Sequence, residues 1–222
     1  MSETIASRFE KIRKKLPPDV SLVVVSKTHG AEQIKQVYDC GQRMFGENKV
    51  QELLSKKDVL PGDIEWHLIG HLQSNKIKQI APFISLIHSV DSARLLSEID
   101  KQGSRINRRI PCLLQVYIAT EETKYGLDFP ETAAMLERTG RGDFKNIEIK
   151  GLMGMASFTD NREQVKQEFQ SLADFFMMQR RLHPNLSILS MGMSSDYEDA
   201  VFLGSNMVRI GSSIFGPRVL PH

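Results

Sequence analysis

The chain has 222 residues, of which 41% are hydrophobic and 25% charged, and its formal net charge is +2. This is the composition of an ordinary globular protein, and no basic run with interleaved aromatic residues indicates a nucleic-acid partner. No apolar segment reaches transmembrane length and residues 1–16 lack a signal-peptide core, so we expect a cytoplasmic protein with no membrane partner. Cys40 and Cys112 lie outside any CxxC or metal-ligand spacing, and we expect both to be reduced thiols.

Short apolar runs alternate with helical stretches along the chain. Ser7–Leu16 predicts an amphipathic helix that stops before two prolines. Eight apolar runs follow, and they predict strands over or within Ser21–Lys27, Arg43–Asn48, Glu65–His71, Ser85–Val90, Pro111–Ala119, Ile147–Ser157, Ser187–Ser194 and Met207–Phe215. The later, longer runs are as apolar as strands that are buried on both faces.

Helices are predicted between these runs, and some carry clear boundary signals. One helix is predicted over Ala31–Cys40. Asp91–Ser92 is a suitable cap for a second helix over Ala93–Lys101. Ser195 and Glu198 form a capping-box pair at the start of a third helix.

This alternation predicts parallel strands joined by right-handed crossovers. Two architectures fit, a closed (β/α)8 barrel and an open doubly wound sheet. An open sheet that binds a nucleotide usually carries GxGxxG or GxxxxGK[ST] after its first strand, and neither motif occurs here. Because the strand count also favours the barrel, we predict a single (β/α)8 TIM barrel over residues 1–222, with no room for a second domain.

Reactive residues of such barrels lie at the carboxyl ends of the strands. Lys27 ends the first predicted strand, where an apolar barrel mouth removes solvent and favours the neutral, nucleophilic amine. The alternative is a solvated lysine that merely ends a strand. Asn48 ends the second strand, where it either hydrogen-bonds a ligand or caps a helix.

Three histidines lie on or near strand ends. His67 and His71 flank the end of the third strand and would share one face at this spacing. Without a third ligand nearby, we expect no metal site there. His88 lies near the end of the fourth strand, where a structural histidine is favoured over a catalytic one.

Glycine and serine residues follow the seventh and eighth strands, in SMGMSSD at 190–196 and VRIGSS at 208–213. Backbone N–H groups in such turns bind phosphate, and barrels often hold phosphate after these two strands. The alternative is that the glycines only form tight turns. A lysine across the barrel mouth from a phosphate cradle is the arrangement that pyridoxal 5′-phosphate (PLP) needs, so we predict PLP as the cofactor.

Eight motifs run in order over nearly the whole chain. They are VVVSKT at 23–28, FGENKVQE at 45–52, WHLIGHLQSNK at 66–76, HSVDS at 88–92, KYGL at 124–127, GLMGMAS at 151–157, SMGMSSDYEDA at 190–200 and VRIGSSIFG at 208–216. Together they resemble the PLP homeostasis proteins of the YggS/PROSC type, and in length and detail the cyanobacterial members. His29 stands where lysine is expected and Ser212 where threonine is common, but neither change removes a required group.

The resemblance implies a barrel like that of alanine racemases and eukaryotic-type ornithine decarboxylases, without their second domain. It implies that Lys27 forms a Schiff base with PLP, that Arg209 faces the pyridine nitrogen and that Asn48 lies near the ring. We expect the cofactor-binding residues to be Lys27, Asn48, Met193, Ser194, Arg209, Gly211 and Ser212, and the resemblance implies that Ser194, Gly211 and Ser212 hold the phosphate. The family acts in PLP supply, vitamin B6 and amino-acid balance without an established reaction, which implies no catalytic residue.

Three functions remain open. The chain is a PLP carrier or regulator, a PLP-dependent racemase or decarboxylase, or an aldolase that uses Lys27 on a sugar phosphate without PLP. Arg209 argues against a strong electron sink, because a guanidinium does not pass a proton to the pyridine nitrogen. The similar racemases also complete their site with a second domain and a partner subunit. We therefore favour a monomeric carrier, with apo PLP-dependent enzymes as the candidate recipients.

Overall fold

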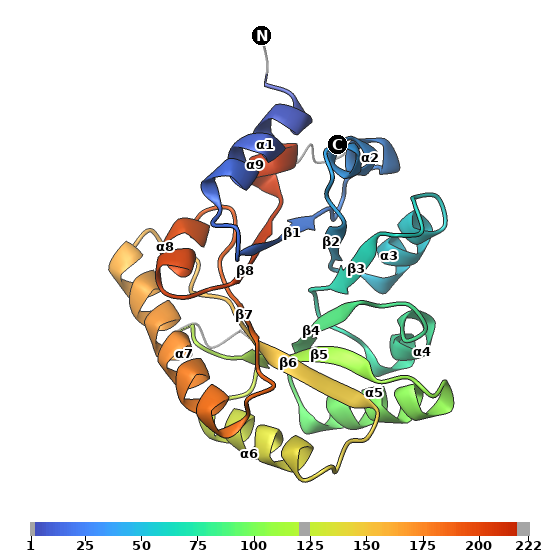
Figure 1. The fold of residues 1–222 in the computed structure, drawn as a ribbon, viewed down its shortest axis with the longest axis vertical. Helices are drawn as coiled ribbons and strands as arrows, with labels where there is room; N and C mark the ends of the chain where they lie inside the picture. The colour runs from blue at the N-terminus through green and yellow to red at the C-terminus, as the bar shows by residue number, and fades with distance from the viewer. Residues whose placement is uncertain (1–2, 120–124, 217–222) are drawn as a thin grey trace.

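The computed structural model describes residues 3–119 and 125–216, and within them eight parallel strands close into a barrel in chain order (Figure 1). The strands are β1 (Ser21–Val25), β2 (Met44–Glu47), β3 (Glu65–Leu68), β4 (Leu86–Val90), β5 (Ile110–Val116), β6 (Ile147–Gly154), β7 (Ile188–Ser190) and β8 (Met207–Ile210). The first strand pairs with the last, with Ser21 opposite Met207. The predicted (β/α)8 barrel is confirmed.

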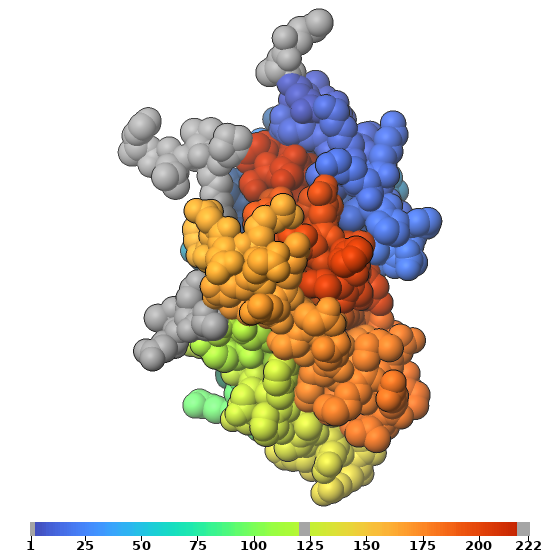
Figure 2. Space-filling model, turned by 90° about the vertical axis from the view of Figure 1, so that its left-hand side faces the viewer, coloured from blue at the N-terminus to red at the C-terminus, as the bar shows by residue number. Residues whose placement is uncertain are grey.

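Helices surround the barrel (Figure 1). They are α1 (Ile5–Lys15), α2 (Ala31–Asp39), α3 (Val50–Lys57), α4 (Ile77–Ile80), α5 (Ala93–Arg105), α6 (Phe129–Gly140), α7 (Arg162–Leu182), α8 (Tyr197–Phe202) and α9 (Ser212–Phe215), with a 3-10 turn η1 (Ser74–Lys76). Helix α5 begins as predicted, because the Ser92 side chain accepts the Leu95 N–H. Figure 2 shows the side of the molecule that α7 covers. Helix α1 packs on α9, and Arg8 donates a hydrogen bond to the Ile214 carbonyl oxygen at 2.6 Å.

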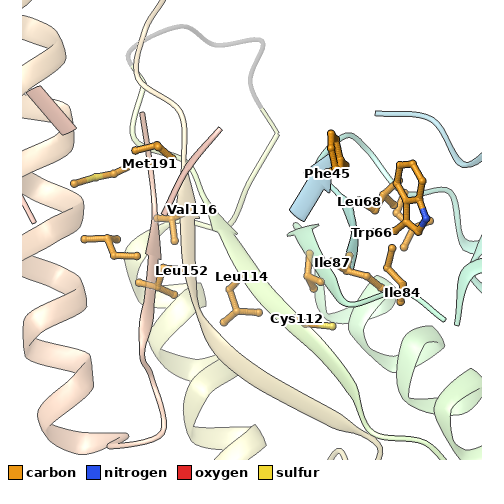
Figure 3. Close-up of a cluster of buried hydrophobic side chains, with 14 of the residues drawn as sticks. Phe45, Trp66, Leu68, Ile84, Ile87, Cys112, Leu114, Val116, Leu152 and Met191 are labelled. Atoms are coloured by element: carbon orange, nitrogen blue, oxygen red, sulfur yellow. The ribbon is translucent and has the colours of Figure 1, made fainter. Parts of the chain in front are cut away.

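Strand residues alternate between two apolar layers, one outside the barrel and one inside it. The outer layer lies between strands and helices, and Figure 3 shows part of it: Phe45, Trp66, Leu68, Ile84, Ile87 and Cys112 in one group, and Leu114, Val116, Leu152 and Met191 in another. The inner layer consists of Val23, Leu86, Leu113, Met153 and Met207. Burial of each such side chain contributes roughly 1.5–3 kcal/mol. The inner layer fills the barrel interior, and the outer layer attaches the helices to the strands.

The eighth strand is shorter than its apolar run predicts. The eighth strand lies within the run Met207–Phe215, as expected, but it ends at Ile210 and Ser212–Phe215 forms the short helix α9. The backbone turns at Gly211, whose carbonyl oxygen accepts two N–H groups of α9 at 2.9 Å. Apolar residues therefore continue past the strand because they bury the helix, not because the strand continues.

The predicted capping box at the start of α8 is wrong. The helix begins at Tyr197, and its N-cap is Asp196, which makes no side-chain capping bond to the helix. The Asp196 carboxylate turns back instead and accepts the N–H of Met193 at 2.6 Å. Ser195 and Glu198 therefore do not form the reciprocal pair that their spacing suggested.

Both cysteines are free thiols, as expected. Burial raises the pKa of the Cys112 thiol. Among the residues that the structure describes, no helix has the length and apolar character needed to cross a membrane. Lys124 of the KYGL motif and residues 217–222 lie outside the described residues.

Candidate functional site

A cavity of about 590 Å³ opens at the carboxyl ends of the barrel strands. Its volume lies within the range of about 300–1,000 Å³ that is typical of small-molecule sites. The seven predicted cofactor-binding residues all line it: Lys27, Asn48, Met193, Ser194, Arg209, Gly211 and Ser212. Closure of the barrel therefore brings together residues that follow the first two strands and residues of the last two βα units.

Lys27 reaches the cavity because it continues the inward face of β1. Val23 lies in the inner apolar layer, Val25 lines the cavity, and Lys27 is the next residue of the same parity. The lysine is half-buried and lies two residues beyond the end of the strand. This is the position at which a barrel presents a reactive side chain to a ligand.

The backbone beside Lys27 is strained. Thr28 has a φ of 69°, a left-handed conformation that is a clear outlier for a β-branched residue and costs roughly 1–2 kcal/mol. Two hydrogen bonds hold this turn, from the Thr28 N–H to Glu52 Oε1 and from the His29 N–H to the Ser26 carbonyl oxygen. Strain that the surrounding structure maintains is common where a side chain must be aimed at a ligand.

Arg209 lies on β8 inside the barrel and is 4% exposed. Its guanidinium donates to the carbonyl and hydroxyl oxygens of Ser190, at 2.9 and 2.7 Å, and to the Gly154 carbonyl at 3.1 Å. Burial lowers the pKa of Arg209 to about 10, with the charge of Asp196 acting in the opposite direction. The side chain therefore remains a cation near neutral pH and presents a hydrogen-bond donor to the cavity.

A buried histidine pair adjoins Arg209 through Ser190. The Nδ1 atom of His67 lies 2.9 Å from Nε2 of His88, and Nδ1 of His88 lies 3.3 Å from the Ser190 hydroxyl. Burial lowers the pKa of His67 to about 4, and burial together with the charges of His67 and Arg209 lowers the pKa of His88 well below its usual value. Both rings are therefore neutral near pH 7, and neither is among the residues that line the cavity.

The expectation that His67 and His71 share one face of a strand is wrong, because β3 ends at Leu68 and His71 lies beyond it. His71 lies instead at the cavity, where its Nδ1 is 3.3 Å from the Asp91 carboxylate and its ring lies 5.5 Å from that of Tyr125. Of the two histidines, only His71 can meet a ligand directly.

Two backbone N–H groups after β8 converge on one point of the cavity wall. The amides of Gly211 and Ser213 both donate to the Ser194 hydroxyl, at 3.3 and 3.5 Å. These bonds are long, so the amides are free to prefer a charged acceptor such as phosphate. The glycines also serve the turns themselves: Gly192 has a φ of 95°, and a Cβ on Gly211 would lie 2.8 Å from the Val25 carbonyl oxygen. The turn role of these glycines is therefore confirmed, and phosphate binding stays a prediction.

Several cavity residues were not predicted. Gln115 lies on the inward face of β5, two residues after Leu113, and its amide donates to the Tyr125 carbonyl at 2.7 Å. A polar residue at an inward position of an apolar run is a signal that could have identified it. Tyr125 and Phe158 line the cavity while 70% and 94% exposed, and no local pattern marks such loop residues.

The chemistry of the cavity follows from these groups. The Lys27 amine, the Arg209 guanidinium, Gly211 and the Ser194 hydroxyl line one space, and two backbone amides converge on that hydroxyl. This set suits a small anionic ligand that carries a carbonyl group able to react with the amine and a further hydrogen-bond acceptor.

Comparison with known proteins gives consistent results. Residues 2–219 match the family model described as alanine racemase, N-terminal domain. A pyridoxal phosphate homeostasis protein of Aquifex aeolicus is 39% identical over 199 residues, which cover 89% of this chain and 86% of that protein. The PLP-bound structure of PipY from Synechococcus elongatus PCC7942 is 36% identical with a TM-score of 0.86, covering 96% of this chain and 100% of that one. An alanine racemase of Clostridium difficile 630 shares the fold at 13% identity and a TM-score of 0.78, with 98% of this chain matching 56% of the racemase chain.

Proposed function

Because this chain belongs to the alanine racemase N-terminal domain family and to the pyridoxal phosphate homeostasis proteins, we propose that its cavity binds PLP as a Schiff base on Lys27. One observation carries the proposal: Lys27 after β1 lines the same cavity as Gly211 and Ser194, and two amides after β8 converge on the Ser194 hydroxyl. The relatives support the choice of ligand, since one is named for PLP homeostasis and another has been solved with PLP bound.

The residues of the cavity fit this cofactor. Gly211, Ser212 and Ser194 would hold the phosphate, and Arg209 would donate to the pyridine nitrogen. Asn48 and Met193 would flank the ring. When bound, PLP supplies an aldehyde that condenses with amines.

The phosphate should supply much of the affinity. Pyridoxal, which lacks the phosphate, should bind at least about a hundredfold more weakly than PLP, since two charge-assisted hydrogen bonds of roughly 1.5–3 kcal/mol each are lost. Ser194→Ala should narrow this difference, whereas Ser97→Ala, on the exposed face of α5, should leave it unchanged. Absorbance titrations with both ligands measure the effect, and equal wild-type affinities for the two would refute the cradle.

We propose further that the protein is a non-catalytic carrier or regulator of PLP, acting in the cytoplasm on apo PLP-dependent enzymes. The cationic Arg209 leaves the ring nitrogen without a proton, which weakens any stabilisation of a substrate carbanion. Tyr125 and Phe158 border an open rim, which suits exchange of the cofactor with solvent better than exclusion of water. A racemase or decarboxylase is the second candidate, because His71 paired with Asp91 is a possible base at the cavity. An aldolase that uses Lys27 without PLP is the third, and it predicts a colourless protein.

The PLP-loaded protein should therefore turn over no amino acid at an enzymatic rate. Incubation with each common amino acid in deuterated water should give no deuterium uptake at Cα, no decarboxylation and no change of chirality at rates near about 1 per second. PLP should nevertheless pass to an added apo-enzyme. If the wild type turns over an amino acid and both Lys27→Ala and His71→Gln abolish that turnover, the protein is an enzyme and the carrier proposal is wrong.

A monomer is the expected state in solution. The exposed apolar side chains of α7 include Met177, Met178 and Leu182, which form a short segment rather than a long stripe. Light scattering over a concentration series should give the mass of one chain. A dimer that persists at low concentration and is lost in Leu182→Lys would contradict this prediction and identify α7 as the interface.

A further inference from the structure

A buried charged cluster on the outer side of the barrel has no role in the proposed function. It consists of Glu47 at the end of β2 with Glu52 and Lys56 of α3, and we call it the Lys56 cluster. The Lys56 ammonium donates to Oε1 of Glu47 and Oε1 of Glu52, both at 2.7 Å, and to the Ser26 carbonyl oxygen at 2.8 Å. These three bonds use all three protons of the ammonium group.

The Lys56 cluster is too deeply buried to be an ordinary surface ion pair. The side chain of Glu47 is 0% exposed and that of Lys56 is 8% exposed. Burial raises the pKa of Glu47, although hydrogen bonds from Lys56 and Ser26 oppose the shift. Oε1 of Glu47 accepts hydrogen bonds from Ser26 and Lys56. The other carboxylate oxygen, Oε2, has no hydrogen-bond partner among the described residues.

The third member of the cluster is ionised more readily. Burial opposes ionisation of Glu52, but the hydrogen bonds from Lys56 and the Thr28 N–H outweigh it and lower its pKa. Buried ion pairs seldom add net stability, because desolvation cancels much of the attraction. Their most useful contribution is to fix one geometry, which directs attention to what this cluster holds in place.

The cluster holds the residues on both sides of Lys27. On one side, the Ser26 hydroxyl donates to Glu47 Oε1 at 2.6 Å while its carbonyl accepts from Lys56. On the other side, the Thr28 N–H donates to Glu52 Oε1 and the residue keeps its left-handed φ of 69°. The peptide units that flank Lys27 are therefore tied to a single ammonium–carboxylate centre.

We propose that Glu52 and Lys56 are positioning residues for Lys27, which set its direction into the cavity without touching a bound ligand. Neither residue lines the cavity, so their effect on binding is indirect, and their hydrogen bonds to Ser26 and Thr28 provide a route to Lys27. The inference rests on the proposed PLP binding at Lys27, but its backbone part is testable in the ligand-free protein.

The first test measures hydrogen exchange in the ligand-free protein. Glu52→Gln removes the charge but keeps the shape, and it should speed exchange of the Thr28 amide by about tenfold or more. The matched control is Glu137→Gln. Glu137 also pairs with a cation four residues later, Arg141 at the C-cap of α6, at 3.1 Å, and its replacement should leave the exchange rate of the Thr28 amide unchanged. If the Gln variant does not fold, Glu52→Asp replaces it. Unchanged Thr28 exchange in a folded variant would overturn the proposal.

The second test is a double-mutant cycle on PLP affinity. Glu52→Gln should weaken binding by about tenfold when Lys27 is present and by much less in the Lys27→Ala background. Equal losses in both backgrounds would mean that Glu52 acts only through general stability, and the proposal would fail. If the wild-type protein takes up no PLP, the proposed function is wrong, and the exchange experiment alone decides whether the cluster positions Lys27.

Discussion

The Lys27→Ala protein is expected to lose the visible absorbance band of bound PLP and all cofactor that borohydride reduction fixes to the chain. The lysine supplies the only amine assigned to the Schiff base, so its removal eliminates the covalent bond rather than weakening it. The fold should survive, because the side chain is half-buried beyond the end of β1 and contributes little to either apolar layer. The free energy of unfolding should change by no more than about 1 kcal/mol.

Absorbance spectra, mass spectrometry after borohydride treatment and denaturant melts measure these effects. The control is Lys49→Ala, since Lys49 follows Asn48 in the chain but is not among the residues lining the main cavity. It should keep both the band and the trapped cofactor. If Lys27→Ala still carries PLP on another lysine, the assignment of the Schiff base is incorrect.

Acidification is expected to destabilise the ligand-free barrel strongly because of the His67–His88 pair. In the folded protein the pKa of His67 is about 4, whereas in the unfolded chain it returns to about 6.5. Between these values the unfolded chain binds a proton that the folded protein does not, so stability falls as the pH drops from 6.5 towards 4. The difference corresponds to about 3 kcal/mol for His67 alone, and the lowered pKa of His88 adds to the loss.

Denaturant melts at several pH values between 7 and 4 measure this loss. His67→Gln should flatten the pH dependence, even if it lowers stability at pH 7 by removing the hydrogen bond to His88. His183→Gln, at the C-cap of α7 outside the barrel, is the control and should leave the pH dependence unchanged. A wild-type free energy of unfolding that stays constant from pH 6.5 to 4 would contradict the prediction.

The barrel and the composition of its mouth could be predicted from the sequence because both depend on local patterns. Each apolar run is long enough to identify a strand, and the residue that ends a run necessarily lies at one end of the barrel. Lys27 and the turn at Gly211 therefore lie where the pattern indicated. The ends of the strands could not be predicted, as within Met207–Phe215, because the apolar faces of short helices continue the same hydrophobic signal.

The buried polar contacts, namely the His67–His88 pair and the Lys56 cluster, could not be predicted from local patterns. The bond between His67 and His88 depends on the register of β3 against β4, which no local pattern determines. The Lys56 cluster combines a strand residue with residues of the following helix, and the spacing of Glu52 and Lys56 predicts only an ordinary helical pair at the surface. In both cases long-range packing decides which polar side chains become buried.

The closure of the ring between β1 and β8 also bears on how the protein is made. Strand β1, which precedes Lys27, pairs with β8, which bears Arg209, from Ser21–Met207 to Val24–Ile210, so residues far apart in the sequence meet at the cavity. During synthesis on the ribosome, Lys27 emerges early, but Ser194, Gly211 and Ser212, which we propose hold the phosphate, emerge only with the last two βα units. A nascent chain therefore has no complete cavity before β8 is made, so PLP bound as proposed would select closed barrels and protect them from degradation by mass action.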